Sequence, residues 1–405
     1  MRQVVLIIVL IMAGACSGHD VVPYSPPDFP ERGFLQSHRL TGSLQMQYPL
    51  SILAVQDYIY VLGSVGDTFV RIYDRVSGEF VRSAVRRGRG PGELLMPGNM
   101  YYDNETGTIC IYDIRQMRLQ KYAAGPDMEY TGSLDFGWTG NSIRNAWQIT
   151  ENISVVNGQT GMDAGKQGRL QLLSADNRIV GSWNMFPIGD KIQRRTYFNT
   201  VFTMSPDRTK LAEGTLFGAI LETFDLREVG IAGHGCRMFY PPSIETRGGV
   251  VLDTPETVFG FPSLCSTDEY VYGVFINGKN PDDFNNISVF DWKGNEVATY
   301  ETDCNVLRIC CSSEDKGCLY AVAVTPDKDF CLVSFNLPDV ASLGRCTQVD
   351  PILEANVEAL ARGESGSFGP LCSKTDRIGI YRMKSCKDCD GPIGKYAMDN
   401  VAYCN

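Results

Sequence analysis

The feature that most constrains the fold is a short strand pattern that recurs about every fifty residues. Six mostly apolar triplets begin at residues 59, 109, 153, 211, 271 and 319, so their starts are 50, 44, 58, 60 and 48 residues apart. Another short apolar run precedes each triplet, and an Asp or Asn lies between the two, which favours a tight turn. Each unit therefore begins with a predicted β-hairpin.

A third strand follows 13 to 20 residues after the start of each triplet, as in Ile72-Tyr73-Asp74 and Val289-Phe290-Asp291. Glycine turns at Gly78 and Gly294 then lead into a fourth strand. One such unit cannot bury both of its faces, whereas six packed radially can. The sequence therefore predicts an all-β, six-bladed propeller over residues 39–338. Units three and four are the least regular, which leaves five- and seven-bladed rings as alternatives.

Closure of the ring requires the two ends of the repeat to meet, because free sheet edges expose unpaired backbone. We expect Arg39–Met46 to supply the outer strand of the last blade, with Ile378–Tyr381 as a competitor for that position. Helical periodicity is confined to Pro351–Arg362, beyond the last unit. Residues 339–405 are expected to form a C-terminal extension that is irregular or held by disulfides.

The N-terminus has the pattern of an export signal. Arg2 is followed by an apolar run from Val4 to Met12, which is too short to span a membrane. Ala13-Gly14-Ala15-Cys16 resembles a bacterial lipobox, although Ala13 stands where that motif usually has Leu. The resemblance implies that residues 1–15 are a signal peptide, that Cys16 carries the lipid, and that residues 16–38 form a tether. An ordinary secretory signal is the alternative.

One further motif points to a family. Arg87-Gly88-Arg89-Gly90-Pro91-Gly92-Glu93, followed by Pro97, lies between the first two units and resembles a motif of six-bladed propeller lipoproteins of Bacteroidetes. These are similar to TolB-like and NHL-repeat propellers. Leu94 departs from the Phe common in that family, and the last 67 residues have no counterpart in it. The resemblance implies the fold and a lipid-anchored place in the cell envelope, in the outer membrane on its periplasmic face or at the cell surface. It implies no reaction.

The same motif supplies the candidate ligand-facing residues, which are Arg87, Arg89 and Glu93. Arginines gathered in an acidic protein attract anions. The structural interpretation is a blade-to-blade connection in which the glycines adopt backbone angles that other residues avoid. A phosphate-binding loop would need a following helix and a Lys-Ser/Thr pair, and neither is present.

Recurring aspartates raise the question of a metal. Asp74, Asp113, Asp225 and Asp291 occupy similar places in their units, and carboxylates suit calcium. Because turn caps produce the same recurrence, we favour a structural role. No metal, cofactor or catalytic residue is assigned, and the three histidines are too few and too scattered for a histidine metal site.

The cysteines are concentrated towards the C-terminus, where eleven of the fourteen lie at or beyond Cys265. Cys110, Cys310 and Cys331 occur in apolar strands and are interpreted as small buried residues. Cys386 and Cys389 form a CxxC pair in the extension, where disulfides are favoured over a zinc site. Lipidation of Cys16 would leave an odd number of thiols.

Net charge limits the partners. The formal charge of −10 disfavours nucleic acid. Besides the membrane reached through the lipid, the predicted partner is a protein, peptide or glycan bound across one face of a non-enzymatic propeller. The alternative is a metal-dependent hydrolase similar to gluconolactonases and paraoxonases, with its site in the central channel.

Overall fold

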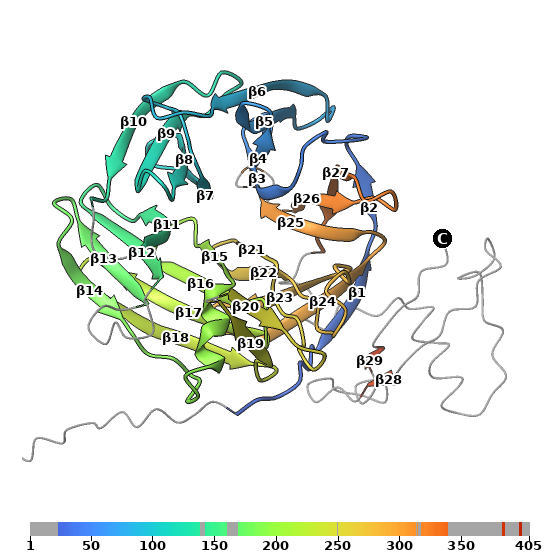
Figure 1. Ribbon diagram of the computed structural model, residues 1–405. Coiled ribbons are helices and arrows are strands. Elements are labelled where there is room, and N and C mark those ends of the chain that lie inside the picture. Colours follow the sequence, from blue (N-terminus) through green and yellow to red (C-terminus); the bar gives the residue numbers. More distant parts are fainter. Residues whose placement is uncertain are drawn as a thin grey trace, which may run out of the picture.

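The computed structural model describes residues 23–137, 142–159, 169–248, 250–312, 314 and 317–338, and the backbone of residues 383–384 and 397–398. Its main sheets are arranged as a ring around a central opening (Figure 1). Six blades are present in this part of the chain, so the predicted six-bladed propeller is confirmed and the five- and seven-bladed alternatives are wrong. Within the described residues, no helix has the length and apolar character needed to cross a bilayer.

The first four blades each consist of four consecutive antiparallel strands. Blade 1 contains β3 (Pro49–Val55), β4 (Tyr58–Val65), β5 (Thr68–Asp74) and β6 (Phe80–Arg86). Blade 2 contains β7 (Pro97–Asp103), β8 (Thr108–Asp113), β9 (Arg118–Ala123) and β10 (Tyr130–Asp135). Blade 3 contains β11 (Ser142–Gln148), β12 (Ile153–Gln159), β13 (Leu170–Ser174) and β14 (Ile179–Trp183). Blade 4 contains β15 (Thr200–Met204), β16 (Lys210–Thr215), β17 (Ile220–Arg227) and β18 (Gly230–Met238).

The last two blades each recruit a strand from the N-terminus. Blade 5 contains β21 (Ser263–Ser266), β22 (Tyr270–Val274), β23 (Asn286–Asp291) and β24 (Glu296–Thr302), with β1 (Glu31–Leu35) added in parallel to β24. Blade 6 contains β25 (Asn305–Cys311), β26 (Cys318–Val324) and β27 (Phe330–Asn336), with β2 (Ser37–Arg39) antiparallel to β27.

The connections add three small elements. The 3-10 helix η1 (Gln193–Phe198) joins blades 3 and 4, and a hairpin of β19 (Ile244–Arg247) and β20 (Val250–Asp253) joins blades 4 and 5. In the C-terminal extension, β28 (Met383–Lys384) pairs with β29 (Ala397–Met398). The predicted segments 351–362 and 378–381 lie outside the described residues.

The recurring triplets all lie in the second strand of a blade. This strand is packed between its blade's own neighbouring strands and between two adjacent blades, so both of its faces are covered. Every residue of β8 is buried, and β26 is buried except at its last residue. The outermost strands β10 and β14 are mostly exposed. Continuous apolar runs are typical of strands covered on both faces, which is why the second strands carried the repeat signal.

An N-terminal strap, residues 25–44, crosses the outside of three blades. The Ser25 amide donates to the Met238 carbonyl of blade 4 (3.0 Å), and Phe29 packs edge-on against Phe290 of blade 5. After β1 on blade 5, the Ser37 amide donates to Asp303 (3.0 Å) and β2 joins blade 6. The strap therefore closes the ring by bringing N-terminal strands to the last blades.

The strap changes two sequence-based boundaries. The predicted tether, residues 16–38, contains β1 and most of β2, so a tether of that length is wrong for residues 31–38. The outer strand of the last blade was predicted at residues 39–46 and lies at Ser37–Arg39, while Leu40 and Leu44 continue the backbone pairing with Leu332 and Phe330. The N-terminal source of the closing strand is confirmed. The sequence-based boundaries were wrong here because β1 and β2 are mostly exposed and therefore show no alternation of apolar and polar residues.

We expect closure to control stability. A chain lacking residues 1–40 loses β1, β2 and their pairing with blades 5 and 6, whereas a chain lacking residues 1–22 keeps the strap. The first truncation should lower the melting temperature by roughly 10 °C or more, since several kcal/mol of packing and hydrogen bonding are lost. The second should melt within about 2 °C of the full chain. Thermal unfolding followed by circular dichroism measures both, and equal melting temperatures would show that the strap does not close the ring.

Candidate functional site

A central cavity of about 950 Å³ is enclosed by the first strands of all six blades, β3, β7, β11, β15, β21 and β25. Its lining includes residues near the beginning of these strands, such as Leu50 and Ser263, and residues at or beyond their ends, such as Ser205 and Ser312. The cavity therefore follows the inner strands along their length. A concave site of this volume is large enough for a small molecule or for a side group of a larger partner.

The lining is mainly apolar, aromatic, hydroxyl and amide in character. Aromatic side chains come from blades 2, 3, 4 and 5, namely Tyr101, Tyr102, Trp147, Phe202, Tyr270 and Tyr272. Many of the polar groups already bond to the neighbouring blade. The Asn99 amide exchanges hydrogen bonds with the Ala146 backbone (both 3.0 Å), and the Ser266 hydroxyl donates to the Met204 carbonyl (3.0 Å). These bonds fix the wall of the cavity.

The cavity has a mouth at the end where the inner strands begin, and Arg308 is the positively charged residue that lines it there. Its guanidinium donates to the carbonyls of Leu50 (2.8 Å), Pro262 (3.0 Å) and Leu307 (2.8 Å), which belong to three successive blades or their entry segments. Its carbon atom Cζ lies 5.5 Å from the Tyr48 ring centroid. Within the described residues, Arg308 makes no ion pair with a carboxylate, so its charge is held in place without being neutralised by a counterion. Desolvation by burial lowers the pKa of Arg308 from its usual value.

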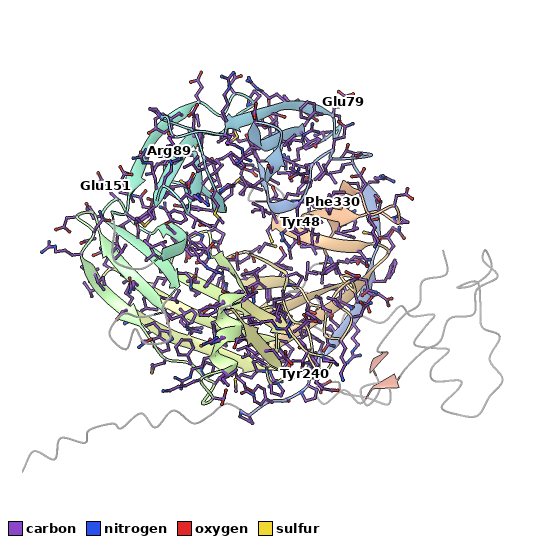
Figure 2. The ribbon with its side chains drawn as sticks, viewed as in Figure 1. Tyr48, Glu79, Arg89, Glu151, Tyr240 and Phe330 are labelled. Carbon is purple, nitrogen blue, oxygen red and sulfur yellow. The ribbon has the colours of Figure 1, made fainter. Side chains whose placement is uncertain are left out.

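The mouth also presents apolar surface. Tyr48 is 49% exposed and Leu50 is 40% exposed. The Tyr48 ring packs edge-on against Phe330, with the centroids 6.1 Å apart, and both residues lie beside the central opening (Figure 2). The mouth therefore combines an exposed aromatic ring, an exposed aliphatic side chain and a fixed positive charge.

Few carboxylates are available for a calcium-type site in this cavity. Its only lining carboxylates among the described residues are Asp268 and Glu269, which are adjacent in the turn between β21 and β22. Within that same part of the chain, no group of three His, Cys, Asp or Glu side chains is placed to hold a metal ion. The carboxylates of the cavity therefore do not by themselves form the metal centre of the hydrolase alternative.

The recurring aspartates lie at turns, where they accept backbone hydrogen bonds. Asp74 accepts from the amides of Val76 and Ser77, and Asp291 accepts from those of Lys293 and Asn295. Asp113, the last residue of β8, accepts from the Met96 amide just before β7 and from the Gln116 amide in the turn after β8. The capping interpretation is confirmed for these three. Asp225 differs, since it pairs with His234 at 3.2 Å.

The glycine motif forms a compact connection from blade 1 to blade 2. The Gly90 amide donates to the Glu93 carboxylate (2.8 Å), and the Gly88 amide donates to the Leu94 carbonyl (2.9 Å). Gly92 has a φ of +72°, and a Cβ there would lie 2.9 Å from Cβ of Tyr130. Glycine is therefore required at this position for both backbone angle and space.

The three candidate residues of this motif are outside the cavity lining. Arg87 donates to the Ser64 hydroxyl (3.1 Å) and lies over the Phe69 ring, and Glu93 closes the loop. Arg89 is exposed and lies over blade 2 in the view of Figure 2. The structure thus gives Arg87 and Glu93 packing contacts within blades 1 and 2. A ligand-facing role for Arg87, Arg89 and Glu93 stays a prediction.

Cysteines in the propeller strands are mostly buried. Cys110, Cys310 and Cys331 are buried free thiols in β8, β25 and β27, as predicted. Cys16 and the cysteines at 346, 372, 386, 389 and 404 lie outside the described residues.

A buried ionic network that the sequence did not predict lies between blades 3 and 4. Arg169, directly before β13, donates twice to the Glu222 carboxylate (2.7 and 3.0 Å), and its Nη1 is 3.3 Å from Oε2 of Glu213. The Tyr197 hydroxyl of η1 also donates to Glu222. Two carboxylates thus share one arginine in a desolvated place. Burial and the neighbouring Glu222 raise the pKa of Glu213 to about 7, against the lowering effect of Arg169.

This network predicts a pH-dependent stability. Glu213 binds its proton more tightly in the folded chain than in the unfolded chain, so the free energy of unfolding should fall as pH rises from about 4.5 to about 7. Glu213→Gln removes this titration. The decrease in the free energy of unfolding between pH 4.5 and pH 7 should therefore become smaller by as much as about 3 kcal/mol, at ~1.4 kcal/mol per pKa unit.

Urea unfolding at pH 5, 6, 7 and 8 measures the effect. Glu245→Gln, at an exposed carboxylate in β19, is the matched control and should retain the wild-type profile. A Glu213→Gln profile parallel to wild type would contradict the assignment.

Comparison with known proteins identifies the fold family. A family model described as TolB-like 6-blade propeller-like matches residues 28–314, which is most of the chain. No curated protein matches the sequence.

Three solved structures illustrate the structural similarity. A Bacteroides fragilis protein that is thought to be exported shares 13% identity, with 75% of this chain and 98% of that chain covered and a TM-score of 0.47. A Bacteroides vulgatus member of the DUF4221 family shares 8% identity over 75% and 95% of the two chains, with a TM-score of 0.45. A gluconolactonase from Xanthomonas campestris shares 14% identity over 78% and 98%, with a TM-score of 0.44. At these levels of similarity, none of the neighbours' activities is transferred to this chain. The family match and the ring of six blades together show that the chain belongs to the TolB-like six-bladed propeller family.

Proposed function

We propose that this propeller is a non-enzymatic binding module whose partner, a protein, peptide or glycan, inserts a group into the mouth of the central cavity. The observation that supports this proposal is the cavity, which has a volume of about 950 Å³. Apolar, aromatic and amide groups line it, and Arg308 lies at its mouth. Such a lining can bind and orient a ligand. Among the described residues, no group of three His, Cys, Asp or Glu side chains is placed to hold a metal ion.

Arg308, Tyr48 and Leu50 give this mouth its recognition chemistry. The guanidinium is already held by three backbone carbonyls, so little side-chain freedom would be lost when an anionic group approaches. Tyr48 and Leu50 offer apolar contact beside it. We infer that the favoured partner presents a carboxylate or another anionic group next to an apolar or sugar face.

The binding test begins with the purified full chain on glycan arrays and displayed peptide libraries. For the best glycan or peptide recovered, Arg308→Gln and Tyr48→Ala should each weaken binding by at least about tenfold, equivalent to ~1.4 kcal/mol. Arg247→Gln, at an exposed arginine on β19 away from the cavity lining, should bind as wild type.

Tyr48→Ala keeps the test informative if Arg308→Gln disturbs the blade contacts, because Arg308, and not Tyr48, donates the hydrogen bonds to the backbone of the neighbouring blades. Unchanged affinity in both folded variants would reject the mouth as the binding site. Turnover of a lactone or ester by the purified chain would reject the non-enzymatic assignment.

We also propose that a lipid on Cys16 holds the propeller at the cell envelope, in the outer membrane. The support is the export-signal pattern ending in Ala13-Gly14-Ala15-Cys16. In a bacterial host that processes lipoproteins, the wild type should partition into the membrane fraction, and Cys16→Ser should move to the soluble fraction. Ser17→Ala is the control and should stay with the membrane. Membrane retention of the Cys16→Ser protein, with no acyl mass on the wild type, would contradict lipidation.

A further inference from the structure

Two thiols of neighbouring blades meet at the wall of the cavity. The Sγ atoms of Cys265 in blade 5 and Cys311 in blade 6 are 3.2 Å apart, and both cysteines are free. The two residues are 46 positions apart in the chain. Both belong to the apolar cluster between blades 5 and 6, where Cys265 is a member and Cys311 packs against it.

The backbone explains why these residues meet. The inner strands β21 and β25 lie side by side around the opening (Figure 1). The Ser263 hydroxyl accepts a hydrogen bond from the Ile309 amide (3.1 Å), which fixes the register of the two strands. Two residues further along each strand, side chains return to the same face. That step leads from Ser263 to Cys265 and from Ile309 to Cys311.

The position of the pair makes it accessible from the cavity. Both cysteines are among its lining residues. Cys311 is partly exposed, whereas Cys265 is 7% exposed. Burial raises the pKa of the Cys265 thiol. Cys311 is thus the better placed of the two to meet a reagent that enters the cavity, and Cys265 is placed to react second.

We propose that Cys265 and Cys311 form a disulfide that links the inner strands of blades 5 and 6, with a small-molecule disulfide as the oxidant. The Cys311 thiolate attacks one sulfur of the oxidant and releases its other half as a thiolate. The Cys265 thiolate then attacks Sγ of Cys311 in the mixed disulfide and releases the second half. Two protein thiols lose two protons and two electrons, and one oxidant disulfide becomes two thiols.

The residues next to this pair, Cys310 and Ser266, face other blades. Cys310 packs in the cluster between blades 6 and 1. On the other strand, the Ser266 hydroxyl bonds to Thr203 and Met204 of blade 4. Cys265 and Cys311 are therefore the residues of these two strands that join blade 5 to blade 6 through sulfur. The proposal stands independently of the proposed binding function.

The test uses the full chain, first reduced and then exposed under native conditions to hydroxyethyl disulfide or oxidised glutathione. Free thiols are alkylated, the chain is digested without reduction, and peptides are mapped by mass spectrometry. The expected result is a cross-linked peptide pair containing Cys265 and Cys311, lost on addition of dithiothreitol. The oxidised chain should also melt about 5–10 °C higher than the reduced chain, because the cross-link closes a loop of some 46 residues.

Two serine variants separate this pair from its neighbour. Cys310→Ser should retain the cross-linked peptide, and Cys311→Ser should abolish it and leave Cys265 alkylated. Alkylation of both Cys265 and Cys311 in the oxidised wild type would overturn the proposal, as would pairing of either residue with a different cysteine. The peptides of the oxidised wild-type chain show by themselves whether Cys265 and Cys311 are linked, so the test does not depend on the variants folding.

Discussion

Closure of the ring by the N-terminal strap is the constraint on which the rest of the structure depends. A circular array of blades becomes rigid only when the last blade is bound to the first, and here β2 from the N-terminus completes the sheet of β27 near the end of the propeller. The strap then continues to Leu44, whose carbonyl accepts from Arg71 (2.7 Å) and Tyr73 (3.2 Å) of blade 1. The hydrogen bonds of one segment thus connect blade 6 to blade 1.

The contacts between inner strands convert this closed ring into a defined cavity. Asn99 joins blade 2 to blade 3, Ser266 joins blade 5 to blade 4, and Arg308 joins blade 6 to blades 1 and 5. These polar groups are largely satisfied by the backbone of the next blade. Aromatic and aliphatic groups, together with the fixed charge of Arg308, therefore line the cavity. The same close approach of inner strands brings Cys265 to Cys311. The cavity and the thiol pair are both consequences of blade packing.

The second strands and their turns could be predicted because their signals are local. The triplets at residues 59, 109, 153, 211, 271 and 319 all fall in strands covered on both faces, and Asp74 and Asp291 cap the turns that follow. The strand β1 could not be predicted in this way, since three of its five residues are exposed and its partner β24 is more than 260 residues away. Its hydrogen bonds, rather than its side-chain pattern, place it in blade 5.

The amino-acid sequence by itself determined the repeat, the six β units and the turn residues, because short-range hydrophobic periodicity and turn chemistry act within a few positions. Tertiary structure alone decided where the cavity lies and which side chains form it. Arg308 has no local signature, and its role comes from carbonyls of blades distant in the sequence. Likewise, the sharing of Arg169 by Glu213 and Glu222, and the meeting of Cys265 with Cys311, arise only when neighbouring blades pack. Charge and thiol chemistry depend on distances in space, and closure of the ring sets those distances.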